Sequence, residues 1–183
     1  ETAGDDLLKV IRHTCVEKGG KLVIPSFSVG RTQEIVYSLN KFSQTGRLPP
    51  VDVFVDSPLS VNATQVFRLH PECFSSEVLQ VMETDPDPFG FNSLRYIEKV
   101  QDSMKLNTRK EPCIIISASG MAEAGRIKHH LANSISDPKN TVLFVGYCAP
   151  VTLGARILSG KKDISIHGNP YTVRADIRRI DSY

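Results

Sequence analysis

The stretch KLVIPSFSVGRTQE, Lys21–Glu34, changes character twice within a short length of chain. An apolar run from Lys21 to Ile24 stops at Pro25, a turn with Ser and Gly follows, and a helix-like pattern opens near Arg31. This order predicts a β-strand whose carboxyl end leads through a short loop into the amino terminus of a helix. Open parallel sheets bind anionic ligands at such a junction.

The same arrangement recurs farther along the chain. It is clearest in CIIISASGMAEAGR (Cys113–Arg126), and looser versions lie in VFVDSPLS (Val53–Ser60) and VLFVGYCAPVTLG (Val142–Gly154). The carboxyl ends of parallel strands meet at one edge of a sheet. The four loops therefore predict a single surface that handles phosphate groups.

Alternating strand and helix patterns fill most of the chain. The alternation predicts an α/β fold, with a three-layer α/β/α arrangement around a mostly parallel, Rossmann-like sheet. Residues 70–92 give no clear pattern, and two Pro and a Gly favour a loop over 82–91. The predicted strands are 21–25, 51–56, 94–97, 113–117, 141–145, 163–166 and 171–180; the predicted helices are 5–18, 31–45, 99–106, 123–133 and 152–158, with another opening at Ser57-Pro58.

Length and composition place the chain among ordinary globular domains. Its 183 residues suffice for one α/β domain with its own core. No apolar run approaches the ~20 residues that cross a bilayer, so no membrane partner is expected. A net charge of +2 does not mark a dedicated nucleic-acid binder. Four cysteines without a CxxC spacing encode neither a zinc knuckle nor a redox pair, and they fit a reducing, cytoplasmic location.

The SASGM loop (Ser117–Met121) is the best candidate for a phosphate contact. It combines two hydroxyls with Gly120 directly before a predicted helix. Gly120 permits a positive φ, and the small side chains let backbone N–H groups approach a phosphate closely. The alternative is that Ser119 merely caps the helix.

Two arginines support an anion site at the same edge. Arg31 and Arg126 each lie in or just before the first turn of a predicted helix, where the helix dipole disfavours a cation by roughly 0.3–1 kcal/mol. An anion between the dipole and the guanidinium would reverse that penalty. The alternative is a salt bridge to a nearby carboxylate, such as Glu34 or Glu123.

Other site classes find little support. His129 and His130 are adjacent, so on a helix they point ~100° apart, and one is expected to face the core and the other solvent. The sequence contains no HxHxDH or HExxH, no GxSxG, and no GxGxxG after a strand. A catalytic metal centre, a nucleophile elbow and a dinucleotide site are therefore not expected within these residues, and no cofactor is assigned to them.

Four segments together resemble the β-CASP region of metallo-β-lactamase nucleases, which include the polyadenylation-site endonuclease and ribonuclease J. They occur in the family's order: IPSFSVGRTQE (Ile24–Glu34), DSPLS (Asp56–Ser60), SASGM with GRIKHHL (Gly125–Leu131), and VGYCAPVTLGARIL (Val145–Leu158). The resemblance implies that residues 1–183 are a single β-CASP domain. Such a domain is inserted into a metallo-β-lactamase catalytic domain, which flanks it on both sides and whose two-zinc site it caps.

The resemblance also implies roles. The domain would hold RNA, by its phosphate backbone or a phosphorylated end, against a site carrying two zinc ions in the parent ribonuclease. The chain alone would cleave nothing, and its partners would be RNA and its own metallo-β-lactamase domain, with a homodimer of the parent left open. The implied phosphate contacts are Arg31, Ser57, Ser119, Gly120, Arg126, His130 and Thr152.

Three alternatives stay open at this point. The chain could belong to a DNA-directed member of the same nuclease family. It could instead be a stand-alone Rossmann-like domain that binds a small ligand or nucleotide, or an interaction module that uses its outer helices.

Overall fold

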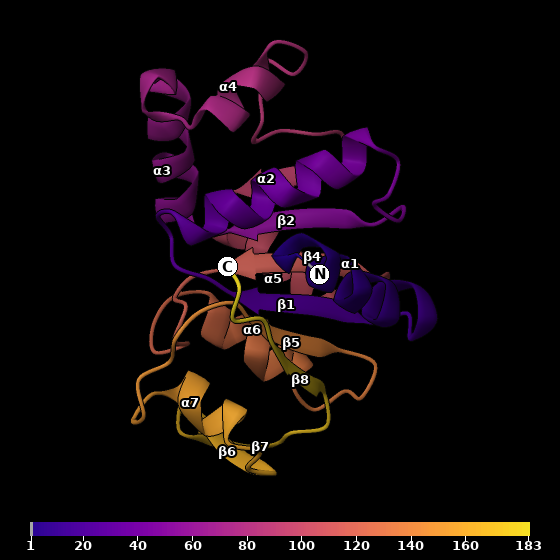
Figure 1. Cartoon of the computed structure of the whole chain (residues 1–183). Helices are drawn as coiled ribbons and strands as arrows, with labels where there is room; N and C mark the ends of the chain where they lie inside the picture. The colour runs from indigo at the N-terminus through magenta and orange to yellow at the C-terminus, as the bar shows by residue number, and fades with distance from the viewer. Residues whose placement is uncertain (1) are drawn as a thin grey trace.

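Six strands form the central sheet of the computed structural model, which describes residues 2–183 (Figure 1). Their order across the sheet is β3-β2-β4-β1-β5-β8, and every neighbouring pair is parallel. Parallel neighbours need crossover connections, and this places all the carboxyl ends at one edge. The strands are β1 (Lys21–Pro25), β2 (Asp52–Asp56), β3 (Leu94–Ile97), β4 (Cys113–Ser117), β5 (Thr141–Phe144) and β8 (Asp176–Arg179).

Both faces of the sheet are buried, because its central strands are apolar on both sides. In β1, Leu22 and Ile24 belong to one hydrophobic cluster, whereas Val23 belongs to the other. In β4, Ile114 and Ile116 join the first cluster in the same way. This alternation decides which side chains at the strand ends meet which helices.

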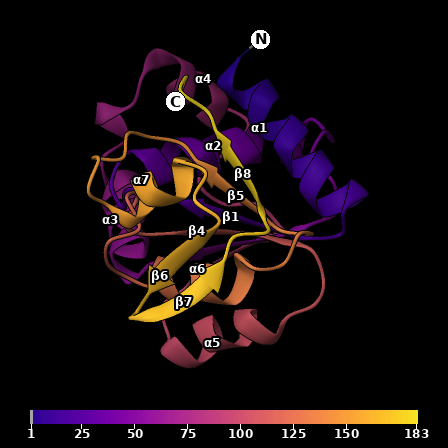
Figure 2. The same cartoon turned by 90° about the horizontal axis from the view of Figure 1, so that it is seen from below.

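Helices cover the two faces and complete three layers. Helix α1 (Ala3–Ile11) continues directly as a π-helix over Arg12–Glu17. Figure 2 shows α1 and α2 on one side of the sheet and α5 and α6 on the other. The predicted three-layer α/β/α fold is confirmed. The covering helices are α1 (Ala3–Ile11) and α2 (Arg31–Gln44) on one face, and α5 (Val100–Thr108), α6 (Ile127–Ser134) and α7 (Leu153–Leu158) on the other.

Two further segments extend from this body (Figure 1). Between β2 and β3 the chain forms α3 (Pro58–Leu69), a 3-10 turn (Pro71–Cys73) and α4 (Ser76–Met82). Between α7 and β8 it forms an antiparallel hairpin of β6 (Asp163–Ile166) and β7 (Asn169–Thr172). No helix within residues 2–183 is both long and apolar enough to span a bilayer.

Two sequence predictions are wrong in detail, and one helix was missed. The helix predicted from residue 123 begins only at Ile127, since Gly125 takes a φ of +86° and the preceding residues form turns. The strand predicted over 171–180 is interrupted where the backbone N–H groups of Arg174 and Ala175 donate to the carbonyl of Ile135. Helix α4 was not predicted, because its seven residues are too few to show a clear period.

The two edge strands of the sheet both carry arginine. In β3, the exposed Arg95 donates from its guanidinium to the carbonyl oxygens of Asn92 and Leu94 at 2.6 and 2.9 Å. At the opposite edge, β8 exposes Arg178 and Arg179. Charged side chains therefore flank the unpaired backbone at both ends of the strand order.

The approach of two backbone segments at Gly20 yields a test of the fold. A Cβ atom at Gly20 would lie 1.8 Å from the carbonyl oxygen of Lys139, an atom that cannot rotate away. We expect Gly20→Ala to lower the free energy of unfolding by about 3 kcal/mol, measured by guanidinium denaturation.

Gly46 provides the matched control. It has a φ of +68° and no atom near its would-be Cβ, so Gly46→Ala should cost only about 1 kcal/mol through backbone strain. Equal losses in the two variants would contradict a steric role for Gly20.

Candidate functional site

The loops that follow β1, β4 and β5 touch one another at the carboxyl edge of the sheet. A Cβ atom on Gly120 would lie 2.9 Å from the ring of Phe27, and one on Gly146 would lie 3.6 Å from the same ring. The thiol of Cys148 donates to the carbonyl oxygen of Gly120 at 3.8 Å. We call these four residues, Phe27, Gly120, Gly146 and Cys148, the loop junction. It brings together three of the four loops predicted to share a surface.

Gly120 has a different reason to be glycine from the one predicted. Its φ is not positive; the left-handed residues of this loop are Ala122 (φ 61°) and Gly125 (φ 86°). Gly120 is buried, and the ring of Phe27 occupies the space that a side chain would need. The prediction of a positive φ at Gly120 is therefore wrong, and close packing explains the residue.

Ser119 organises its own loop. Its hydroxyl oxygen accepts hydrogen bonds from the backbone N–H groups of Glu123 and Ala124 at 3.1 and 3.2 Å. The backbone N–H of Ser119 donates to the carbonyl of Ala124 at 3.0 Å, which closes the turn. The side chain thus caps a turn ahead of α6 and not the helix itself, while remaining partly accessible.

Ser57 and Thr152 are both helix caps. The Ser57 hydroxyl accepts from the backbone N–H of Ser60 at 3.2 Å and begins α3. The Thr152 hydroxyl accepts from the N–H of Ala155 at 3.2 Å and begins α7. Each hydroxyl thus satisfies a backbone N–H that the start of a helix leaves without a partner. Both side chains are also buried.

Arg31 pairs with the carboxylate that the sequence offered as its alternative partner. Its guanidinium lies 2.5 Å from the Glu34 carboxylate, one turn later in α2, and 6.0 Å from the centre of the Tyr183 ring. Thr32 ties this helix start to the loop before it, because its hydroxyl donates to the carbonyl of Phe27 at 2.7 Å. Arg31 is therefore the first residue of α2, and it lies four residues along the chain from Phe27 of the loop junction.

Arg126 and His130 are committed to Asp56, which sequence reasoning did not single out. Asp56 ends β2 and is fully buried. Its carboxylate contacts an Arg126 guanidinium nitrogen at 2.7 Å and the His130 Nε2 at 2.5 Å, and it also accepts a short hydrogen bond from the Ser103 hydroxyl. Arg126 reaches further, to the carbonyl oxygen of Glu98 at 2.6 Å.

This buried carboxylate joins four elements. Asp56 comes from β2, Ser103 from α5, His130 from α6, and Arg126 from the end of the SASGM loop. Burial raises the pKa of Asp56, but hydrogen bonds from His130, Ser103 and Arg126 outweigh it and hold the pKa below its usual value. The carboxylate is thus charged at neutral pH and, through Arg126, fixes the end of the SASGM loop that leads into α6.

A signal for Asp56 existed in the sequence. An acidic residue that ends an otherwise apolar, buried strand must be paired, because an unpaired buried charge is costly. The predicted split of the adjacent histidines is confirmed: His130 is 2% exposed, and His129 faces outward against the ring of His167, with ring centres 4.7 Å apart. Within residues 2–183, no three His, Cys, Asp or Glu side chains are grouped so as to hold a metal ion.

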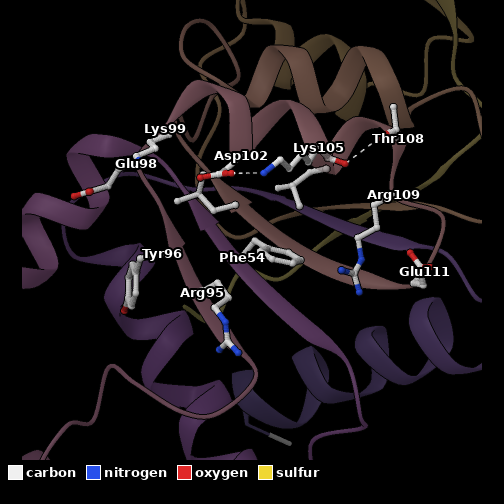
Figure 3. Close-up of a pocket in the computed structure, with 12 residues that line it drawn as sticks. Phe54, Arg95, Tyr96, Glu98, Lys99, Asp102, Lys105, Thr108, Arg109 and Glu111 are labelled. Atoms are coloured by element: carbon white, nitrogen blue, oxygen red, sulfur yellow. Dashed lines mark hydrogen bonds and ion pairs between the residues drawn. The ribbon is translucent and has the colours of Figure 1, made fainter.

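A separate cavity of about 570 Å³ lies between β3 and α5 (Figure 3). Phe54 forms part of its lining, with the Arg109 guanidinium 5.4 Å from the ring centre. Arg109 pairs with Asp52 at 2.7 Å, and Lys105 pairs with Asp102 at 2.8 Å. None of the site residues predicted from the sequence lines this cavity.

Comparisons with known proteins place the chain in a family context. The profile of the Beta-Casp domain matches residues 32–157. The chain is 34% identical over 181 residues to Ribonuclease TTHA0252 of Thermus thermophilus, covering 97% of the chain and 41% of that protein. It is 34% identical over 181 residues to the RNase J-like protein of Methanocaldococcus jannaschii, covering 99% and 41%. Transcription termination factor FttA of Methanosarcina mazei is 32% identical over 163 residues, covering 88% and 25%. The chain thus spans at most about two fifths of the length of these relatives.

The buried pairing of Asp56 should contribute much more to the free energy of unfolding than the exposed pair of Arg31 and Glu34. Asp56→Asn keeps the shape but leaves Arg126 without its buried counter-charge, so we expect a loss of roughly 3–5 kcal/mol in the free energy of unfolding at pH 7. Glu34→Gln, which breaks the more exposed pair with Arg31, should cost under about 1 kcal/mol. Urea denaturation of both variants measures the difference.

The stability lost in Asp56→Asn should depend on pH. Since the folded-state pKa of Asp56 lies below the ordinary 3.8, the stability it supplies is present above about pH 4 and is lost as the pH falls through the folded-state value. The gap between the wild-type protein and Asp56→Asn should therefore narrow below about pH 4. A gap that stays constant down to pH 2 would argue against a charged Asp56.

Proposed function

The chain belongs to the β-CASP family, and we propose that it is the substrate-capping, RNA-phosphate-binding domain of a zinc-dependent ribonuclease with a metallo-β-lactamase catalytic domain. Two of its relatives are named as a ribonuclease and an RNase J-like protein. The loop junction is the observation that carries the proposal, because it gathers the turns after three parallel strands at the edge where such sheets bind anions.

The proposed RNA contacts fall into two groups. Arg31 and the partly accessible Ser119 are the residues we propose to meet phosphate directly, the first by charge and the second through its turn. Arg126 and His130 are held by Asp56, so we propose that they support the SASGM loop from behind. Ser57, Gly120 and Thr152 would shape the surface through caps and close packing.

Phosphodiester hydrolysis itself is not assigned to these residues. The described part of the chain offers no set of ligands that fits a zinc ion. Following the family resemblance, we propose that two zinc ions and their ligands belong to the metallo-β-lactamase domain. The chain alone would then bind RNA without cleaving it.

The salt dependence of RNA binding tests the phosphate role of Arg31. Each phosphate neutralised on single-stranded RNA adds about 0.7 to the slope of log affinity against log salt. Arg31→Ala should therefore weaken binding of a 5′-phosphorylated oligoribonucleotide and lower the slope by about 0.7. Fluorescence anisotropy at several salt concentrations measures both quantities.

Two variants on the same helix sharpen this test. Lys41 lies in the last turn of α2 and pairs with Glu77 of α4. Lys41→Ala should therefore leave the salt dependence of RNA binding unchanged. Glu34→Gln removes the carboxylate that competes for Arg31, so it should tighten binding. An unchanged slope in Arg31→Ala would refute its contact with phosphate, and tight binding of a mononucleotide instead of RNA would favour a stand-alone nucleotide-binding domain.

A further inference from the structure

Among the Phe and Tyr residues of 2–183, only two have exposed side chains. The chain has eight Phe and five Tyr, and all of them lie in this part. Phe27 is 41% exposed and Tyr147 is 64% exposed, whereas the other aromatic residues are buried or partly buried. Leaving large apolar rings in water forgoes the stabilisation that burial gives, so exposed rings gathered at one place mark an interaction site.

Both rings lie at the loop junction. Gly146, whose Cβ would lie 3.6 Å from the Phe27 ring, directly precedes Tyr147. Cys148, whose thiol donates to the carbonyl of Gly120, directly follows it. The backbone is thus held on both sides of Tyr147, while its side chain projects into solvent.

Tyr147 is also unengaged. Within residues 2–183 its hydroxyl makes no hydrogen bond, and its ring takes part in no aromatic or cation–π contact, unlike the rings of Tyr37, Tyr96 and Tyr183. A tyrosine has only two side-chain torsions to order, so a ring on a fixed backbone is a binding surface with a low entropic cost.

We propose that Tyr147, with Phe27 on the adjoining loop, is a stacking platform for a base of single-stranded RNA. This inference rests on the proposed function, which brings phosphates to the turn formed by Ser119 and Gly120 at the same junction. Single-stranded nucleic acid is held by phosphate contacts combined with aromatic rings on which bases stack. Within residues 2–183, the exposed Phe and Tyr rings both lie at this one edge, which favours a base over a protein surface.

The competing occupant is a protein surface. Val29 and Val151, 61% and 83% exposed, also lie on loops at this edge, and an apolar patch can receive a protein. The two occupants make different demands on residue 147. A protein contact accepts any apolar side chain of similar size, whereas stacking requires an aromatic ring.

Binding of two matched oligomers tests the platform. One is a short 5′-phosphorylated oligoadenylate, and the other is an abasic ribose-phosphate oligomer of the same length and charge. In anisotropy titrations at one salt concentration, Tyr147→Leu should weaken oligoadenylate binding by about 5- to 150-fold and leave the abasic oligomer within about twofold. Tyr147→Phe should retain binding of both, and Val151→Ala should match the wild-type protein.

The outcomes separate the two proposals. Wild-type binding of both oligomers with equal affinity, or loss of oligoadenylate binding in Tyr147→Phe as large as in Tyr147→Leu, overturns the stacking platform and leaves the phosphate role standing. Binding of neither oligomer overturns the proposed function and the platform with it. Because Tyr147 is exposed, circular dichroism of each variant is expected to match that of the wild-type protein.

Discussion

The buried carboxylate of Asp56 is the constraint on which the carboxyl edge depends. Removing a charge from water is expensive, and here the cost is offset by an arginine, a histidine and a serine that arrive from three different elements. Because Arg126 is both a partner of Asp56 and the last residue before α6, the pairing fixes where the SASGM loop ends. The loop start is fixed independently by β4. The turn between them therefore has little freedom, which suits a surface that must meet a ligand without rearranging.

The loop junction is the second constraint on the carboxyl edge. Three loops pack through a single ring, that of Phe27, against backbone that lacks a side chain at Gly120 and Gly146. Parallel topology brings these loops to one edge, but only the glycines let them touch. The site residues thus divide by their partners. Arg126 and His130 are held by the buried carboxylate of Asp56, whereas Tyr147 is exposed and makes no such contact.

Much of the fold follows from local sequence. The strands Lys21–Pro25, Leu94–Ile97 and Cys113–Ser117 match their predicted bounds. In the first and last of these, an apolar run marks the strand. The start of α6 could not be found this way, since it depends on a close approach of Gly125 to the carbonyl of Ala118 that no local pattern encodes. The site was harder still. The alternative of a salt bridge to a nearby carboxylate holds for Arg31, which pairs with Glu34. Arg126 pairs instead with Asp56, which lies 70 residues away, and nothing local links the two.

The arginines on the two edge strands have a consequence for solubility in a crowded cell. An open sheet ends in rows of unpaired backbone groups that can recruit a strand from another molecule and begin fibrillar growth. At one end Arg95 occupies the carbonyl of Leu94, and at the other the exposed Arg178 would set like charges against each other in any edge-to-edge dimer. Both strands are also only four residues long. The molecule can therefore keep a highly apolar sheet at its centre without offering a template for amyloid-like stacking.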